Sequence, residues 1–329
     1  MKWVWRILLL LVVLLVAAFF IFRTPDTDPA QMRAKYGGAP SQFVEIGDGV
    51  TVHLRDEGPQ NERRDAPAII LLHGSNADLH TWQPWVDALK GRYRVIRFDQ
   101  IGHGLTGPDP DSDYSIPNFV SDIEEVADSL GLDRFVIGGN SMGGSHAVAY
   151  ALAHPERVEG LILVDAAGAP IRKEGRGNIG FAIARTPVVN RIMNHITPRS
   201  MIEQSLRETV SNQAIVTDAM VDRYWELLRY PGNRDATRIR FSGEWNSFSQ
   251  EDVAQIEAPA LIIWGEEDGL IPVEAGLWYD RYLPGSTLVV YEGIGHLPQE
   301  EEAQRSADYV AQWLSRQSFA ARTSPSPTQ

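Results

Sequence analysis

The chain has 329 residues, 43% of them hydrophobic and 22% charged, which is enough for one large globular domain or two ordinary ones. Its formal net charge of −13 disfavours nucleic acid and anionic lipid headgroups as electrostatic partners, because both would be repelled. The chain has no cysteine, which excludes thiol catalysis, disulfide bonds and cysteine-ligated zinc.

The first element in the chain is an apolar stretch from Trp3 to Phe22, in which Arg6 is the only charged residue. As a helix rising about 1.5 Å per residue, it would be about 30 Å long, which matches the hydrocarbon core of a bilayer. A cleaved signal peptide is the alternative, although its apolar region is usually shorter and ends in a small-x-small site. We predict that residues 1–23 are an uncleaved N-terminal membrane anchor.

Basic residues flank this stretch on both sides, so the charge bias that orients a membrane helix is weak. Lys2 precedes the stretch, whereas Arg23, Arg33 and Lys35 follow it. The proximity of the N-terminal charges favours a cytoplasmic N-terminus, which would put the rest of the chain in the periplasm of a bacterium. Residues 24–40 are rich in proline, glycine and charge, and this composition predicts a linker.

A hairpin followed by alternating short strands and helices is expected next. Gly47 to Gly49 separate two segments of alternating residues, which is typical of a hairpin. The apolar runs that follow are AIILL (68–72), YRVIRF (93–98), RFVIG (134–138), LILVD (161–165), ALIIW (260–264) and STLVVY (286–291). Because these runs are apolar on both faces and alternate with helical segments, we expect an α/β fold with a mostly parallel central sheet.

The interval between Asp165 and Ala260 is much longer than a βαβ unit of about 30 residues. It contains helix-like segments and many aromatic residues, and an insertion after a strand's carboxyl end lies over the ligand crevice of an open sheet. We interpret it as a cap, with additional core packing as the alternative. The predicted boundaries are 41–170 and 251–316 for the core, 171–250 for the helical cap and 317–329 for a disordered tail.

A candidate nucleophile lies in the glycine-rich segment between the third apolar run and the helix-like segment after it. Gly139 to Gly143 match the pattern G-x-S-x-G, with Ser141 at its centre. In this strand–turn–helix context, glycines on either side let the two elements approach closely, and the turn holds the serine in a strained backbone conformation. We therefore expect Ser141 to project from the carboxyl end of the sheet.

A serine nucleophile needs a base that removes its proton, and an acid that orients the base. The order of the three along such a chain is serine, acid, histidine. His296 lies in a loop directly after an apolar run, which makes it the candidate base. The histidines that lie elsewhere downstream of the serine are His146, His154 and His195.

The candidate acid is Asp268, in the loop after the preceding apolar run, where loops of adjacent strands converge. Glu266 and Glu267 compete for this role, and so does Asp165 at the end of LILVD.

An oxyanion hole is expected beside the serine. In this architecture the backbone N–H of the residue after the nucleophile, Met142, is one donor, and the second comes from the loop after an earlier strand. Ser75 is the candidate second donor, with Asn76 as the alternative. The remaining polar residues of the neighbouring loops are predicted to brace those loops by hydrogen bonds; they are His73, Asp99 and His103.

The motifs LLHGSN, FDQIGHG, GNSMGG, WGEEDGLIP and GIGHLPQEE, in this order, resemble the α/β-hydrolase fold superfamily over about residues 40–315. The resemblance implies that Ser141, Asp268 and His296 are the nucleophile, acid and base, and that the long insertion is the family's cap.

The serine motif looks most like the branch that includes carbon–carbon bond hydrolases of aromatic ring-cleavage products, and many esterases share it. Two features depart from those carbon–carbon hydrolases. Ser75 to Asp78 replace a glycine-rich loop, and Leu297 replaces the tryptophan that tends to follow the catalytic histidine.

The first functional hypothesis is therefore a membrane-anchored serine hydrolase that cleaves carboxylic esters with an apolar acyl or alcohol group through an acyl-enzyme. Its expected partners are a small apolar ester or lipid-like substrate and the membrane, with no nucleic acid. The alternatives are a carbon–carbon bond hydrolase of ring-cleavage-type diketo acids, a cofactor-free haloperoxidase and a non-catalytic ligand receptor. No cofactor is expected, and no metal, because the histidines do not cluster at ligand spacings.

Overall fold

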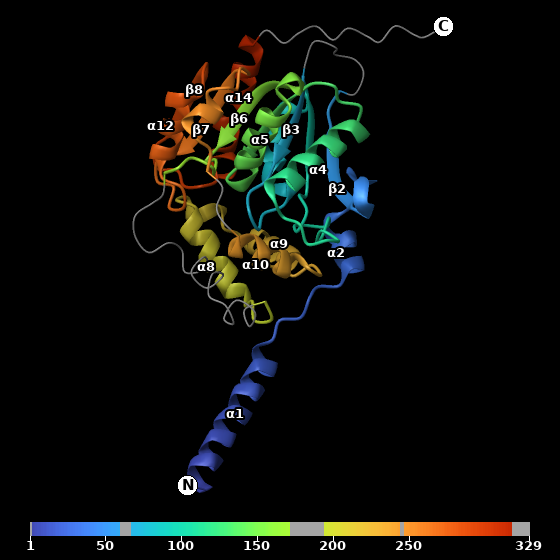
Figure 1. Ribbon diagram of the computed structural model, residues 1–329, viewed down its shortest axis with the longest axis vertical. Coiled ribbons are helices and arrows are strands. Elements are labelled where there is room, and N and C mark those ends of the chain that lie inside the picture. The colour runs from blue at the N-terminus through green and yellow to red at the C-terminus, as the bar shows by residue number, and fades with distance from the viewer. Residues whose placement is uncertain (1, 60–66, 172–193, 244–246, 318–329) are drawn as a thin grey trace, which may run out of the picture.

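The computed structural model describes residues 2–59, 67–171, 194–243 and 247–317, which form a central sheet with helices on both faces (Figure 1). The strands are β1 (Ser41–Glu45), β2 (Thr51–Glu57), β3 (Ala68–Leu72), β4 (Arg94–Phe98), β5 (Phe135–Asn140), β6 (Val158–Val164), β7 (Ala260–Gly265) and β8 (Ser286–Tyr291). Their order in the sheet is β1-β2-β4-β3-β5-β6-β7-β8. The β1–β2 and β2–β4 pairs are antiparallel and the other pairs are parallel, so the mostly parallel sheet and the hairpin are confirmed.

Helices connect and cover these strands. Those in the described part of the chain are α1 (Lys2–Phe22), α2 (Pro29–Tyr36), α3 (Gln83–Leu89), α4 (Ile116–Ser129), α5 (Met142–Ala153), α8 (Arg199–Thr209), α9 (Asp218–Leu228), α10 (Asn233–Ser242), α11 (Gln250–Val253), α12 (Val273–Tyr282), α13 (Pro298–Glu301) and α14 (Ala303–Arg316).

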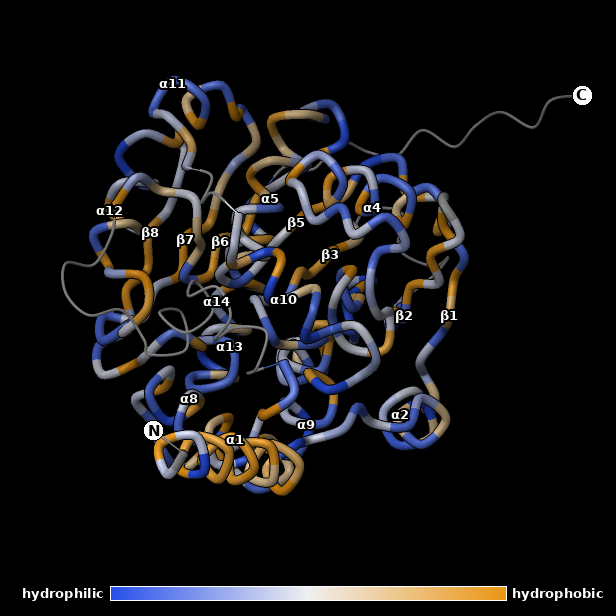
Figure 2. Tube along the Cα trace, turned by 60° about the horizontal axis from the view of Figure 1, so that its bottom comes forward, coloured by the Kyte–Doolittle hydropathy of each residue, from blue (hydrophilic) through white to orange (hydrophobic). Residues whose placement is uncertain are grey.

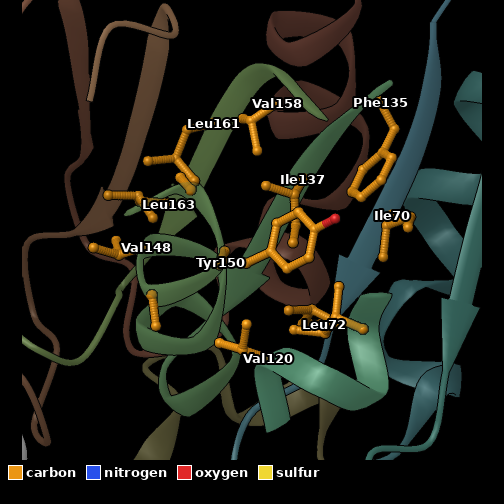
Figure 3. Close-up of a cluster of buried hydrophobic side chains, with 14 of the residues drawn as sticks. Ile70, Leu72, Val120, Phe135, Ile137, Val148, Tyr150, Val158, Leu161 and Leu163 are labelled. Atoms are coloured by element: carbon orange, nitrogen blue, oxygen red, sulfur yellow. The ribbon is translucent and has the colours of Figure 1, made fainter. Parts of the chain in front are cut away.

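The hydrophobic core lies on both faces of the sheet because successive strand residues point to opposite sides. In β3, Ile70 and Leu72 pack with residues of α4 and α5 on one face, which Figure 3 shows around Tyr150. Ile69 and Leu71 pack with residues of α3 and α14 on the other face. This double covering explains why the central strands appear in the sequence as continuous apolar runs.

The segment 24–40, expected to be a linker, contains an ordered helix that contacts the folded domain. Asp28 caps α2, because its side chain accepts a hydrogen bond from the backbone N–H of Gln31. Met32 of α2 is buried in a cluster with Leu105, Leu227 and Tyr230. The composition of this segment predicts flexibility, but its apolar residue finds partners that are remote in sequence.

The described part of the cap consists of α8, α9 and α10, which lie together on one side of the sheet (Figure 1). Thr217 caps α9 by accepting a hydrogen bond from the backbone N–H of Met220. The buried residues of α9 recur at helical spacing and form one apolar face; they are Met220, Val221, Tyr224 and Leu227. Residues 172–193 and 244–246 of the expected cap, and 318–329 of the expected tail, lie outside the described residues.

The segment that follows α1 contacts the cap through a hydrogen bond and an ion pair. The backbone N–H of Thr24 donates to the carbonyl oxygen of His195 at 2.8 Å. Arg234 of α10 forms an ion pair with Asp26 at 2.6 Å. The N-terminal helix is therefore joined to the domain on the side that carries the cap.

Candidate active site

Ser141 lies in the sharp turn between β5 and α5. Its backbone has φ 54° and ψ −120°, a conformation that is strained for a residue with a side chain. The flanking glycines let the two elements approach, since a Cβ on Gly139 would lie only 2.2 Å from the backbone carbon of Gly143. A Cβ on Gly143 would lie 2.3 Å from the backbone oxygen of Leu72. The glycine-rich segment thus forms the turn that the motif predicts.

His296 and Asp268 form a buried pair, with 2.6 Å between His296 Nδ1 and Asp268 Oδ2. Each residue is 4% exposed. The other carboxylate oxygen of Asp268 accepts hydrogen bonds from the backbone N–H groups of Leu270 and Ile271, at 2.7 and 3.0 Å. The carboxylate is therefore fixed by the loop after β7, and it orients the imidazole ring of His296.

Asn140 connects the nucleophile turn to the histidine loop. Its side-chain amide donates to the backbone oxygens of Val164 and His296, at 3.1 Å in each case. The residue directly before Ser141 thereby fixes the loop that carries His296. Within the described residues the hydroxyl of Ser141 makes no hydrogen bond to His296, and such contacts often tighten only when substrate binds.

Asp165, the alternative acid, lies next to Asp268 but is not the partner of His296. Its Oδ1 accepts a hydrogen bond from the backbone N–H of Gly265 at 3.0 Å. Burial, together with the neighbouring Asp268 charge, raises the pKa of Asp165 well above its ordinary value. Asp165 therefore holds its proton more readily than an ordinary carboxyl group, and the partner of His296 is Asp268.

The other two candidates for the acid, Glu266 and Glu267, are exposed to solvent, whereas Asp268 is buried.

Among the described residues, one group has the geometry to hold a metal ion. It consists of Asp165, Asp268 and His296, whose ligand atoms lie within 4.8 Å of one another. Asp268 and His296 already contact each other in this group, so we interpret it as an acid–base pair.

The two residues predicted to donate to an oxyanion lie under one side chain of the cap. Nη1 of Arg240, on α10, is 2.9 Å from Ser75 Oγ and 3.0 Å from Met142 Sδ. Asn76, the alternative donor, has φ 60° and accepts a hydrogen bond from the Thr237 hydroxyl at 2.8 Å. The loop after β3, the turn after β5 and α10 therefore meet at one place.

The polar residues expected to brace the surrounding loops make such contacts. His73 accepts at Nε2 from the backbone N–H of Gln100 at 3.0 Å, and His103 Nδ1 lies 3.0 Å from the backbone oxygen of Ile101. Burial lowers the pKa of both histidines, so they stay neutral. Asp99 accepts from the backbone N–H groups of Leu79 and Leu105 at 2.8 Å each, and Asp99 Oδ2 lies 2.7 Å from His53 Nδ1.

The sequence analysis missed Asn140 and Arg240. Asn140 could have been noted, because it occupies the variable position directly before the nucleophile in G-x-S-x-G. Arg240 carries no distinguishing signal, since Arg234 and Arg238 occur in the same helical segment.

The sheet order, the strained turn at Ser141 and the Asp268–His296 pair on consecutive strand-end loops define a class of protein. The α/β-hydrolase fold family matches residues 67–303, and the chain belongs to this family. The family and its known members support hydrolase activity.

Individual relatives are similar over most of the domain. A 2-hydroxy-6-oxononadienedioate/2-hydroxy-6-oxononatrienedioate hydrolase of Burkholderia vietnamiensis is 31% identical over 83% of this chain and 94% of its own length. The structure of a meta-cleavage product hydrolase from Pseudomonas fluorescens IP01 has a TM-score of 0.70 and 25% identity, covering 83% of this chain and 97% of the other. A membrane phospholipase A structure shares the fold, with a TM-score of 0.70 and 22% identity, over 95% of this chain and 98% of the other.

Proposed function

We propose that this protein is a serine hydrolase that cleaves a carbon–carbon bond in ring-cleavage-type diketo acids. The observation that carries the proposal is the 31% identity to a hydrolase of this kind over 83% of the chain. The buried Asp268–His296 pair and the strained Ser141 provide the chemistry. The sequence alone favours carboxylic esters as the first hypothesis, and the relatives reverse that order.

The reaction uses the three residues in the order in which acyl transfer requires them. Ser141 Oγ bonds to the ketone carbon while His296 takes the hydroxyl proton, and the backbone N–H groups of Ser75 and Met142 stabilise the oxyanion. When the tetrahedral intermediate collapses, the carbon–carbon bond breaks. Its electron pair becomes an enolate conjugated with the second carbonyl of the substrate, and the leaving fragment takes the proton from His296. Water activated by His296 then hydrolyses the acyl-enzyme and regenerates Ser141.

Ester hydrolysis is the second candidate function, and the loops around the triad favour it. Leu297, directly after the base, is buried in a cluster with Leu206 and Val210 of the cap region. A tryptophan tends to follow the histidine in the carbon–carbon hydrolases that the sequence resembles, and Ser75 to Asp78 also differ from their glycine-rich loop. The same acyl-enzyme would form, with an alkoxide as the leaving group in place of an enolate.

A direct comparison of two substrate classes tests the proposal. Purified full-length protein and its Ser141→Ala variant are assayed on a vinylogous diketo acid and on p-nitrophenyl esters of increasing chain length. The proposal expects higher kcat/KM on the diketo acid, and loss of that activity in Ser141→Ala. Turnover of the esters alone would favour the second candidate. Halide- and peroxide-dependent bromination that exceeds both, or ligand binding without turnover, would contradict both hydrolase functions.

We also propose that α1 anchors the protein in a membrane, with the catalytic domain on the periplasmic side. The stretch Trp3–Phe22 is long and apolar enough to cross a bilayer, and none of its most apolar window is buried against the domain. Figure 1 shows α1 projecting away from the cap, and Figure 2 shows that most of its residues are hydrophobic. Trp3 and Trp5 suit the interfacial region of a bilayer.

A further inference from the structure

The histidine loop, residues 292–297 between β8 and α13, is held from three directions at His296. The backbone N–H of His296 donates to the carbonyl oxygen of Thr209, the last residue of α8, at 2.9 Å. Its carbonyl oxygen accepts from the side chain of Asn140 at 3.1 Å, and its Nδ1 lies 2.6 Å from Asp268 Oδ2. The cap, the nucleophile turn and the acid loop therefore each fix a different part of this residue.

The backbone of the histidine loop lies directly against the backbone of the cap. A Cβ on Gly295 would lie 2.7 Å from the backbone oxygen of Thr209 and 2.8 Å from the backbone nitrogen of Ser211. Leu297 is 4% exposed and belongs to a hydrophobic cluster formed mainly by cap residues. The residues on both sides of His296 thus pack against the cap near the end of α8.

The side chain of Glu301, at the end of α13, joins the same two segments and is buried between them. Its Oε1 accepts hydrogen bonds from the backbone N–H groups of Gly295 and Leu297, at 3.0 and 3.4 Å. Its Oε2 accepts from the backbone N–H groups of Ser211 and Asn212, at 2.8 Å each. One carboxylate oxygen therefore binds the histidine loop, and the other binds the cap.

Only a carboxylate suits the position of Glu301, because all of these partners are donors. Both of its oxygens accept, and the negative charge strengthens each hydrogen bond. An amide has one accepting oxygen and one donating NH2 group, so a glutamine would leave the N–H groups of either the loop or the cap facing another donor. A buried N–H that loses its acceptor costs free energy, which would favour separation of the two segments.

We propose that Glu301 is a positioning residue, which sets the place of His296 relative to Ser141 by joining the histidine loop to the cap. The inference rests on the proposed serine-hydrolase chemistry and applies equally to carbon–carbon bonds and esters. Glu301 acts through backbone groups of the loop, and a shift of about 1 Å in the base can slow a reaction about 100-fold. The cap therefore helps to place the base as well as covering the site.

Labelling of Ser141 by a fluorophosphonate tests this role, because Ser141 Oγ displaces fluoride from phosphorus while His296 takes the hydroxyl proton. We expect Glu301→Gln in the full-length protein to lower the maximal labelling rate by about 10- to 100-fold. The probe concentration that gives half the maximal rate should stay within about threefold. A residue that only stabilised the fold would not change the maximal rate of protein that urea unfolding shows to be folded.

Glu300→Gln is the matched control, since it makes the same chemical change at the neighbouring residue of α13. Glu300 contacts the Thr81 hydroxyl and lies 3.9 Å from Arg223 of the cap, and both partners are outside the histidine loop. We expect Glu300→Gln to keep the maximal rate within about threefold. Glu301→Asp retains the charge and both accepting oxygens on a shorter side chain, so its rate should lie between those of Glu301→Gln and the unaltered protein.

The unaltered protein distinguishes failure of the inference from failure of the proposed function. If it is labelled on Ser141, an equal maximal rate in Glu301→Gln, or an equal loss in Glu300→Gln, would overturn the inference alone. If Glu301→Gln does not fold, Glu301→Asp decides in its place, and an unchanged maximal rate in that variant would overturn the inference. No labelling of Ser141 in the unaltered protein would contradict the proposed chemistry, and the inference with it.

Discussion

Asp165 and Asp268 lie side by side at the ends of adjacent strands, and their hydrogen-bond partners differ. Asp268 accepts hydrogen bonds from two backbone N–H groups and pairs with His296. Asp165 accepts one backbone hydrogen bond, and burial beside Asp268 raises its pKa. Two chemically identical side chains can therefore have different roles, because only Asp268 contacts His296.

Replacing each aspartate by asparagine tests this difference. We expect Asp268→Asn to lower kcat by about 10⁴-fold, because the amide cannot hold His296 in the required tautomer. Asp165→Asn should keep kcat within about tenfold, since an amide resembles a protonated carboxyl group and can still accept from Gly265. Similar losses in the two variants would mean that Asp165 acts as a carboxylate.

Candidate site residues can be predicted from the sequence where a local motif marks them. They cannot be predicted where only the packing of the cap against the core brings them to the site. Ser141 could be found because its motif joins an apolar run to a helical segment, and His296 and Asp268 because each follows an apolar run. Arg240 could not, because only the packing of α10 against the loop after β3 distinguishes it from Arg238.

At the scale of elements, the close contact of β5 with α5 determines where Ser141 lies. We expect Gly139→Ala to destabilise the fold by about 3 kcal/mol, because its methyl group would overlap the backbone of Gly143. Gly91→Ala is the control, since a Cβ there has no atom within 4 Å and the φ of Gly91 suits any residue. Urea unfolding of both variants measures the difference, and equal midpoints would contradict this explanation of the turn.

The segment between α1 and β1 shows where composition is a poor guide to structure. Proline, glycine and charge predict a linker, yet α2 is capped by Asp28 and buries Met32 against Leu227 of the cap. Lys35 also pairs with Glu226 at 2.7 Å. These partners lie far away in the sequence, so no local pattern could reveal them.

Two truncated chains test the contribution of α2. A chain that begins at Thr24 retains α2, whereas one that begins at Gly38 loses it. We expect the shorter chain to be less stable by at least about 2 kcal/mol, the cost of removing a buried methionine from its packing. Equal urea midpoints would show that α2 contributes nothing to the fold.

For the whole molecule, the strand pattern was sufficient to predict a mostly parallel sheet, because buried parallel strands are apolar on both faces. The antiparallel pairing of β2 with β4 is not predictable, because no local pattern in Thr51–Glu57 indicates which strand it pairs with. The position of the cap relative to α1 also depends on contacts remote in sequence, such as Arg234 with Asp26.

Membrane attachment can be tested on the whole chain. We expect full-length protein to remain in the membrane pellet after an alkaline carbonate wash, and a chain that begins at Thr24 to be soluble. The reason is the hydrocarbon-length apolar surface of α1, which has no protein partner in its most apolar window. If expression of the full-length chain yields a soluble product whose intact mass lacks α1, the apolar stretch is a cleaved signal peptide instead.

The central claim is that Ser141 is a nucleophile activated by His296, and labelling with a fluorophosphonate tests it most directly. Full-length protein and its His296→Ala variant are treated with the probe, and peptide mass spectrometry locates the adduct. We predict a single adduct on Ser141 in the unaltered protein, and labelling slower by several orders of magnitude in His296→Ala. No adduct on Ser141, or equal labelling in the two proteins, would contradict the account.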